Sequence, residues 1–216
     1  MQFKISLPRF LYTVQDVPSP DFNPTTETGI PMAKNKRDIE RQVKQEEIEA
    51  AATRLFVERG YDATSMAQVA EQAGVAPNTL YWYYKNKDDM LVATLNRLVG
   101  KGLSEYAQMA DQPLDAQLLW LLGQFEQFSA LVTTVHARIE HAAAVREWHA
   151  NFHMMLDQLT IARLQAQGVA AEEAGLLATV TGFVVEGLLS HATPQPQREA
   201  IVQWLLRAGT LQSHPC

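Results

Sequence analysis

The spacing of apolar residues predicts an amphipathic helix near the start of the regular part of this chain. Residues at i, i+3, i+4, i+7 and i+8 share one face of a helix, and one segment keeps that spacing. Its apolar residues are Ile48, Ala51, Ala52, Leu55 and Phe56. Gly60 follows at a position where glycine commonly ends a helix, so the helix is expected to stop there.

Two shorter helices are expected next. Ser65-Met66-Ala67-Gln68 fits the capping box, in which Ser65 accepts from the third amide while Gln68 reaches back. This helix should stop at Gly74, and Ala76-Pro77 should start another, because proline fits a first turn without losing a hydrogen bond. Three helices close together, the last two joined by a tight turn with glycine, predict a helix-turn-helix.

The remaining two-thirds of the chain also shows helical spacing. Asp88 and Asp89 suit the N-terminus of a longer helix, and Pro113, Gly168 and Pro194 separate the later ones. The expected helices are 88–109, 115–131, 133–144, 145–167, 172–191 and 197–211. No strand or repeat pattern competes. The predicted fold class is therefore all-α, with an N-terminal three-helix helix-turn-helix domain and a C-terminal helical domain.

The first 32 residues show neither helical nor strand periodicity. They hold five of the ten prolines, namely Pro8, Pro18, Pro20, Pro24 and Pro31. We predict that residues 1–32 are disordered, or that they come from an overlong reading frame whose true start is Met32. Lys34, Lys36 and Arg37 follow as a short basic arm. The two domains are expected at 33–87 and 88–216.

Charge is distributed unevenly along the chain. The net charge is −6, but residues 33–101 hold 11 Lys and Arg against 10 Asp and Glu, whereas residues 102–216 hold 5 against 11. The N-terminal part can therefore approach a polyanion. Cys216 is the single cysteine, which excludes an internal disulfide framework. No apolar run approaches the ~20 residues of a membrane helix, so a cytoplasmic location and no membrane contact are expected.

Four consecutive aromatic residues follow the predicted tip of the third helix. In a helix-turn-helix this helix lies in the major groove of DNA, and its N-terminal side chains reach base edges. Leu80 and Tyr84 are spaced to face inward, toward Val69 and Phe56. The tip residues and the outward-facing aromatics are then available to duplex DNA. They are Pro77, Asn78, Thr79, Tyr81, Trp82 and Tyr83.

At these residues the chain resembles the tetracycline-repressor (TetR) family of bacterial transcription regulators. The resembling segment runs from about Glu47 to Met90 and contains LFVERGYDATSMAQVAEQAGVAPNTLYWYYKNKDDML. The resemblance implies that Ser65 binds phosphate, and that the tip residues, the outward aromatics and Lys87 face DNA. Ala67 stands where many members have an arginine, Ala76 where serine is usual, and Tyr83 where histidine is frequent. Base discrimination is therefore expected to rest on Asn78, Thr79 and Pro77.

The resemblance also implies what the helical domain does. It should form a homodimer through the last two helices, where small residues at 175, 178, 182 and 187 permit close helix approach. It should also bind a small-molecule inducer that shifts the two DNA-reading heads apart. Candidate pocket residues are aromatic or methionine: Trp120, Phe125, Phe128, Trp148, Phe152, Met154, Met155 and Phe183. Each of them could instead be ordinary core.

Three other classes of function compete with this one. His149 and His153, at i and i+4, could share a metal ion and make the protein a metal-sensing regulator; His136, Glu140 and His141 are candidates for a further ligand. No metal and no cofactor are otherwise expected. A helical protein-interaction module without DNA binding is a second alternative. An enzyme is not expected, because no phosphate loop, dinucleotide fingerprint, nucleophile elbow or HExxH motif is present.

Overall fold

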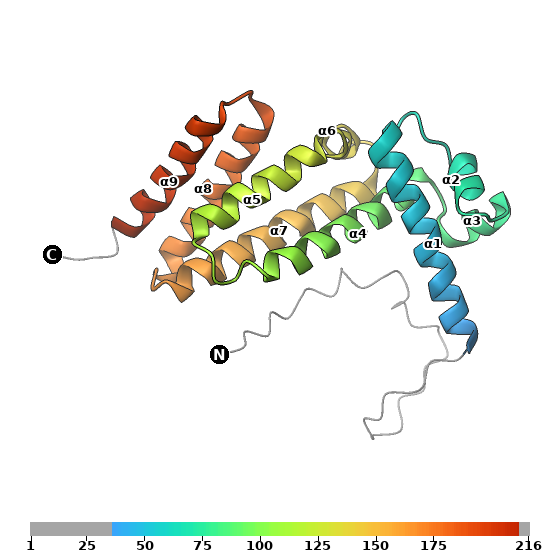
Figure 1. Ribbon diagram of the computed structural model, residues 1–216, viewed down its shortest axis with the longest axis horizontal. Helices are drawn as coiled ribbons and strands as arrows, with labels where there is room; N and C mark the ends of the chain where they lie inside the picture. The colour runs from blue at the N-terminus through green and yellow to red at the C-terminus, as the bar shows by residue number, and fades with distance from the viewer. Residues whose placement is uncertain (1–35, 212–216) are drawn as a thin grey trace, which may run out of the picture. The chain divides into compact units, whose positions relative to one another are not determined.

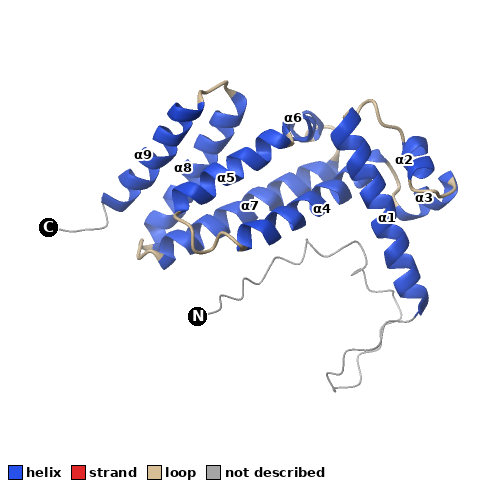
Figure 2. Ribbon diagram, in the orientation of Figure 1, coloured by secondary structure: helices blue, strands red, loops and turns tan. Residues whose placement is uncertain are grey.

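The computed structural model describes residues 36–211, and this part of the chain folds entirely into helices and connecting loops (Figures 1 and 2). The predicted all-α class is confirmed. In order, the helices are α1 (Lys36–Arg59), α2 (Met66–Gln72), α3 (Pro77–Tyr83), α4 (Lys87–Ala107), α5 (Leu114–Gln127), α6 (Ser129–Arg138), α7 (Ala143–Ala166), α8 (Ala171–Ser190) and α9 (Gln195–Leu211).

The first helix begins much earlier than the apolar spacing indicates. Lys36 and Arg37, predicted as part of a basic arm, are the first residues of α1, and Lys36 lies 3.9 Å from the Glu40 carboxylate one turn on. The prediction of an arm at these two residues is wrong, because i to i+4 pairs of charged and amide side chains extend the helix beyond its buried face. Lys34 and the expected disordered segment 1–32 lie outside the described residues.

The chain divides within α4 into two compact units, the first ending at Leu98 and the second beginning at Val99. Our expected boundary follows Lys87, where α4 begins. The first half of α4 instead belongs with the N-terminal unit, and its Met90, Leu91 and Leu95 are buried. An amphipathic helix belongs to the unit whose core its apolar stripe contacts.

The N-terminal unit is built as the sequence predicts. The face of α1 from Ile48 to Phe56 is buried, and Val69 and Ala70 of α2 are buried as well. Both halves of the capping box are present: Gln68 N donates to Ser65 Oγ at 3.2 Å, and Ser65 N donates to Gln68 Oε1 at 2.8 Å. Pro77 is the first residue of α3. The α1, α2 and α3 ribbons lie side by side in Figure 1.

Gly74, in the turn between α2 and α3, has a φ of 64°. An L-residue in this left-handed region costs about 1–2 kcal/mol, and a Cβ at Gly74 would meet no atom within 4 Å. We therefore expect Gly74→Ala to destabilise the N-terminal unit by about 1–2 kcal/mol through backbone strain alone.

Hydrogen exchange of the α2 and α3 amides measures this change. Gly123→Ala is the matched control, because Gly123 lies inside α5 with an ordinary helical φ. That substitution should stabilise its helix by about 0.5–1 kcal/mol. Equal protection of α2 and α3 in Gly74→Ala and wild type would contradict the argument.

The C-terminal unit has a core of aliphatic residues from α5, α7, α8 and α9. Within it α7 packs along α8, and α5 packs along α9. The buried members are Leu114, Leu118, Leu122, Leu164, Val169, Ala174, Val185, Leu188 and Val202. Arg198 of α9 pairs with Glu126 of α5 at the surface of this packing.

The expected helices 115–131 and 133–144 end earlier, and the break between them lies at Phe128. The backbone of Phe128 leaves the helical region with φ −112° and ψ 25°. α5 therefore ends at Gln127, and α6 runs from Ser129 to Arg138. The apolar spacing continues through this bend, since Phe125, Phe128 and Leu131 keep intervals of three residues. Periodicity could not reveal the break.

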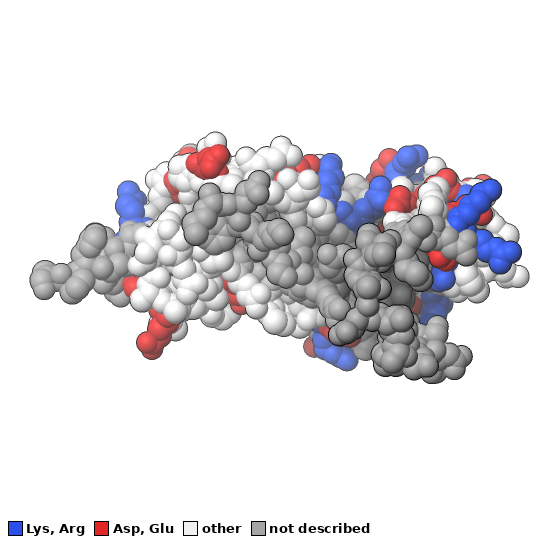
Figure 3. All heavy atoms as spheres, turned by 90° about the horizontal axis from the view of Figure 1, so that it is seen from below, with Lys and Arg blue, Asp and Glu red and all other residues white. Residues whose placement is uncertain are grey.

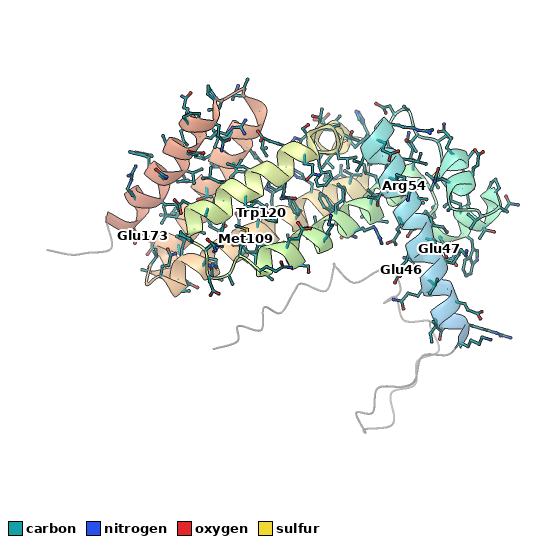
Figure 4. The ribbon with its side chains drawn as sticks, viewed as in Figure 1. Glu46, Glu47, Arg54, Met109, Trp120 and Glu173 are labelled. Carbon is teal, nitrogen blue, oxygen red and sulfur yellow. The ribbon has the colours of Figure 1, made fainter. Side chains whose placement is uncertain are left out.

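A buried glutamine organises the connection between α4 and α5. Gln117 accepts from the Tyr106 hydroxyl at 2.7 Å and donates to the carbonyls of Met109 at 3.1 Å and Gln112 at 2.7 Å. These bonds satisfy the side chain amide, which is 1% exposed. Buried polar groups are tolerated when hydrogen-bonded in this way. Figure 4 labels Met109, which lies in this connection, and Trp120, which lies on α5.

α8, with 20 residues, is long and apolar enough to cross a membrane by length and composition alone. Our prediction that no apolar run approaches this length is wrong in that respect. Three glutamates interrupt the run, namely Glu172, Glu173 and Glu186, and Ala174, Ala178, Val185 and Leu188 are buried within the helical unit. Core helices of soluble proteins can have the same length and composition, so α8 is weak evidence for a membrane span.

Candidate DNA-binding surface

α3 presents an almost continuous polar and aromatic surface. Pro77, Asn78 and Thr79 are exposed at its N-terminus, and Tyr81 and Trp82 are 52% and 67% exposed. Tyr83 is half-buried. These residues offer the amide of Asn78, the hydroxyl groups of Thr79, Tyr81 and Tyr83, and the indole N–H of Trp82. The surface has the chemistry that base edges and phosphate oxygens require.

Two residues hold α3 on the rest of the unit. Leu80 is completely buried, and Tyr84 is 5% exposed. The Tyr84 hydroxyl donates to Glu49 Oε1 on α1 at 2.5 Å. Burial and the neighbouring Glu49 carboxylate raise the pKa of Tyr84, so that the hydroxyl keeps its proton and remains a donor. The predicted inward pair is thus buried, and Tyr84 also ties α3 to α1.

The guanidinium group of Arg41 lies over the ring of Trp82. The guanidinium carbon of Arg41 lies 4.8 Å from the centre of the Trp82 ring. Trp82 also contacts Tyr83 edge-on, with ring centres 5.3 Å apart and an interplanar angle of 87°. A cation over an aromatic face is attracted by the ring quadrupole. Arg41 therefore lies at the surface that α3 presents.

Lys87 has internal partners in this conformation. Its ammonium donates to the carbonyls of Tyr61 at 2.9 Å and Thr64 at 3.1 Å, and lies 4.0 Å from the centre of the Tyr61 ring. The Tyr61 hydroxyl donates to Asp88 at 2.6 Å. Lys87 thereby joins the start of α4 to the loop between α1 and α2. Its predicted contact with DNA phosphate stays a prediction, and the sequence had given no sign of this structural role.

Ser65 is exposed at the start of α2, where a phosphate can approach. Its oxygen already accepts the capping bond from Gln68. Since a hydroxyl both donates and accepts, its proton remains available to an acceptor outside the protein. The capping box therefore fixes the position of Ser65 without exhausting its hydrogen-bonding capacity.

The charges around this surface are mixed. Residues 36–98 hold 9 Lys and Arg against 10 Asp and Glu, and Figure 3 shows both signs interspersed at the helix-turn-helix end. Figure 4 shows Glu46, Glu47 and Arg54 along α1. Contact with a phosphate backbone would therefore depend on individual hydroxyl, indole and amide donors, rather than on a strong positive field.

The predicted pocket residues fall into two groups. Trp148 stacks on Phe152 with ring centres 5.0 Å apart, and Phe152 meets Phe125 edge-on at 5.9 Å. Trp120 packs against Tyr106 at 6.3 Å. Met155 is buried and Phe128 is half-buried. By contrast, Phe183 is 70% exposed and Met154 is 52% exposed, so this chain alone does not enclose these two.

The histidines predicted as weak metal candidates do lie together. His149 Nε2 and His153 Nε2 are 3.0 Å apart on α7. His136 of α6 and Glu186 of α8 converge with His149, and His153 lies near His149 and Glu186, whereas Glu140 and His141 do not belong to this group of ligand atoms. Glu186 was not anticipated, because no sequence spacing links it to α7.

Comparison with known proteins supports the same surface. Residues 48–94 match the model of bacterial regulatory proteins of the tetR family. The chain is 23% identical over 151 residues to the fatty acid metabolism regulator protein of Bacillus subtilis, covering 70% of this chain and 71% of that protein. It is 28% identical over 169 residues to the HTH-type transcriptional regulator BetI of Brucella canis, covering 70% and 83%.

A solved structure shares the fold. It is a putative TetR-family transcriptional regulator from Mesorhizobium loti, with a TM-score of 0.64 and 18% identity over 82% of this chain and 98% of that one. At this identity the likeness concerns the fold alone. The sequence match covers α2 and α3 completely, which are the helices that carry the exposed surface described above.

Proposed function

Because this chain is a DNA-binding transcriptional regulator of the TetR family, we propose that it is a repressor that binds a palindromic operator as a homodimer and is released by a small-molecule inducer. The observation that carries the proposal is the exposed run Pro77 to Trp82 on α3, interrupted only by the buried anchor Leu80. A helix that is anchored on its inner side and exposes its N-terminal and outward-facing residues can enter a groove.

The residues of this surface divide into two roles. Tyr81, Trp82, Tyr83 and Ser65 are proposed to donate to phosphate oxygens, which sets the register of the protein on DNA. Asn78, with Thr79 and Pro77 beside it, is proposed to contact bases, since an asparagine amide can pair with the N6 and N7 atoms of adenine. The ammonium of Lys87 has three N–H donors, and two of them are bonded to carbonyl groups of the protein. Lys87 is proposed to donate to phosphate through the third.

Tyr81→Ala is expected to weaken binding to every DNA sequence by about the same factor. Loss of one hydrogen bond to a charged phosphate costs about 1.5–3 kcal/mol at each half-site. Fluorescence anisotropy with the chain's own upstream DNA, and with unrelated DNA of equal length, measures both affinities. Tyr81→Phe is the matched control, because it keeps the ring and removes only the hydroxyl; an affinity like that of Tyr81→Ala would assign the effect to the hydroxyl.

Asn78→Ala should act differently, by relaxing preference at one base position in each half-site. A bidentate amide contact contributes about 1–3 kcal/mol of discrimination. Binding to operators substituted one base pair at a time measures this preference. If Tyr81→Ala and Asn78→Ala both kept wild-type affinity and selectivity, the assignment of α3 to DNA would be wrong.

The dimer is proposed to form through α8 and α9. Leu176, Val180 and Phe183 follow one another at intervals of four and three residues, so they share one face of α8, and all three are exposed. Trp204 of α9 is 67% exposed, and α8 packs against α9 (Figure 1). Large apolar side chains gathered on adjacent helices mark an interaction surface. A second copy is the proposed occupant because a palindromic operator requires a two-fold protein.

The inducer is proposed to bind in the helical unit, near the aromatic group of Phe125, Trp148 and Phe152. Such rings line most small-molecule sites. Release requires a ligand that prefers the DNA-incompetent arrangement of the dimer, because the difference in affinity is the coupling free energy. Titration of candidate effectors into the protein–operator complex tests this: the right ligand lowers operator affinity, whereas tight binding without any such change would defeat the mechanism.

The alternative functions are not favoured. The relatives are named as transcriptional regulators, which fits a protein that is not an enzyme and leaves a pure protein-interaction module without support. A cytoplasmic location is proposed from the same family membership. A gel shift with the chain's own upstream DNA separates the regulator from the interaction module in one experiment, since only the regulator retards that fragment at physiological salt.

A further inference from the structure

We propose that His136, His149, His153 and Glu186 form a binding site for a divalent transition-metal ion of the Zn²⁺ class. Three helices of the C-terminal unit supply these ligands: α6 carries His136, α7 carries His149 and His153, and α8 carries Glu186. The site lies wholly within one compact unit. It concerns ion binding only, and is independent of the proposed repressor function.

The ligand atoms are close to the separations that a zinc ion needs. Zinc bonds of 2.0–2.1 Å in a tetrahedron place two ligand atoms about 3.4 Å apart. His149 Nε2 and His153 Nε2 are 3.0 Å apart, and His153 Nε2 is 3.3 Å from Glu186 Oε1. One ligand atom each from His136, His149 and Glu186 lie within 4.8 Å of one another. His153 Nε2 lies outside this group of three but is close to two of its members, His149 and Glu186.

The three imidazole rings of the site lie close together around His149. The ring of His149 lies between its neighbours, 5.2 Å from the His136 ring and 4.3 Å from the His153 ring.

A single N–H proton on His153 cannot make hydrogen bonds to both of its neighbours in this cluster. The His153 Nε2 atom lies within reach of both His149 Nε2 and Glu186 Oε1, and one ring N–H points at only one acceptor. A divalent cation accepts lone pairs from several such atoms at once, and imidazole nitrogens and carboxylate oxygens are among the ligands that Zn²⁺ takes in proteins.

The experiment is a Zn²⁺ titration of the full-length, tag-free protein against a competing chromophoric chelator at pH 7. Every protein carries Cys216→Ser, so that the terminal thiol does not compete. We expect one Zn²⁺ per chain, and a loss of affinity of at least about tenfold in both His149→Ala and Glu186→Gln. Glu186→Gln retains the size and oxygen of the side chain while removing its charge, and circular dichroism verifies folding of each variant.

His141→Ala is the matched control. His141 is an exposed histidine near the α6–α7 connection that does not belong to the cluster, so its loss should leave zinc affinity unchanged. The proposal is overturned if the wild type takes up no Zn²⁺ at micromolar concentrations. It is also overturned if His149→Ala and Glu186→Gln bind as tightly as His141→Ala. Because no DNA is present, either failure leaves the repressor function untouched.

Discussion

Phe183→Glu is expected to convert the proposed dimer into monomers. Phe183 is 70% exposed in the single chain, on the same face of α8 as the exposed Leu176 and Val180. A two-fold interface buries it twice, and each buried phenyl group contributes about 2 kcal/mol. Losing both raises the dimer dissociation constant by at least roughly a thousandfold, and two carboxylates in an apolar interface add a desolvation cost. Analytical ultracentrifugation at micromolar concentration measures the change.

Operator binding should be lost together with the dimer. A single helix-turn-helix reads only a few base pairs, so a monomer forfeits the second half-site. Met154→Glu is the matched control, because Met154 is an exposed apolar residue of α7, outside the apolar face of α8 and α9. It should leave both the dimer and DNA binding intact. A wild-type protein that sediments as a monomer would remove the basis of this prediction.

Leu80→Ala should have the largest effect on the stability of the N-terminal unit. Leu80 is completely buried on the inner side of α3, and truncation of such a leucine costs about 2–5 kcal/mol through lost transfer free energy and the cavity left behind. Small domains have total stabilities of about 5–15 kcal/mol, so α3 would open often. DNA affinity should fall although Leu80 itself touches no base.

Hydrogen exchange of the α2 and α3 amides, measured beside operator affinity, detects this opening. Leu80→Met is the conservative control, since a swap of similar volume usually costs less than about 1.5 kcal/mol. It should retain most of the protection and most of the affinity. Wild-type protection of α3 in Leu80→Ala would show that Tyr84, bonded to Glu49, anchors the helix without Leu80.

The local features of the DNA-binding surface were predictable because each depends on neighbours in sequence. The capping box at Ser65 and Gln68 needs residues three apart, and Pro77 at the first turn of α3 needs only its own ring geometry. The burial of Leu80 and Tyr84 follows from a spacing of four. The exposure of Asn78, Tyr81 and Trp82 follows from the same spacing.

The interactions that cross from one helix to another were not predictable. No local pattern indicated that Lys87 lies against Tyr61 and Thr64, about 25 residues earlier in the chain. Phe183 was placed among pocket residues, but its side of α8 is exposed. On a helix that is apolar around most of its circumference, the sequence pattern does not indicate which apolar residues are buried. The packing of the neighbouring helices decides which of them face the core.

By itself, the sequence determined the all-α class, the helix-turn-helix and the chemistry at its tip, because short-range hydrogen bonding and helical periodicity are encoded within a few residues. It also placed His149 and His153 one turn apart. Only the tertiary structure brought His136 and Glu186 to them, and only it separated the exposed apolar face of α8 from the core. Contacts between residues distant in the chain depend on how whole helices pack, and no local pattern records that arrangement.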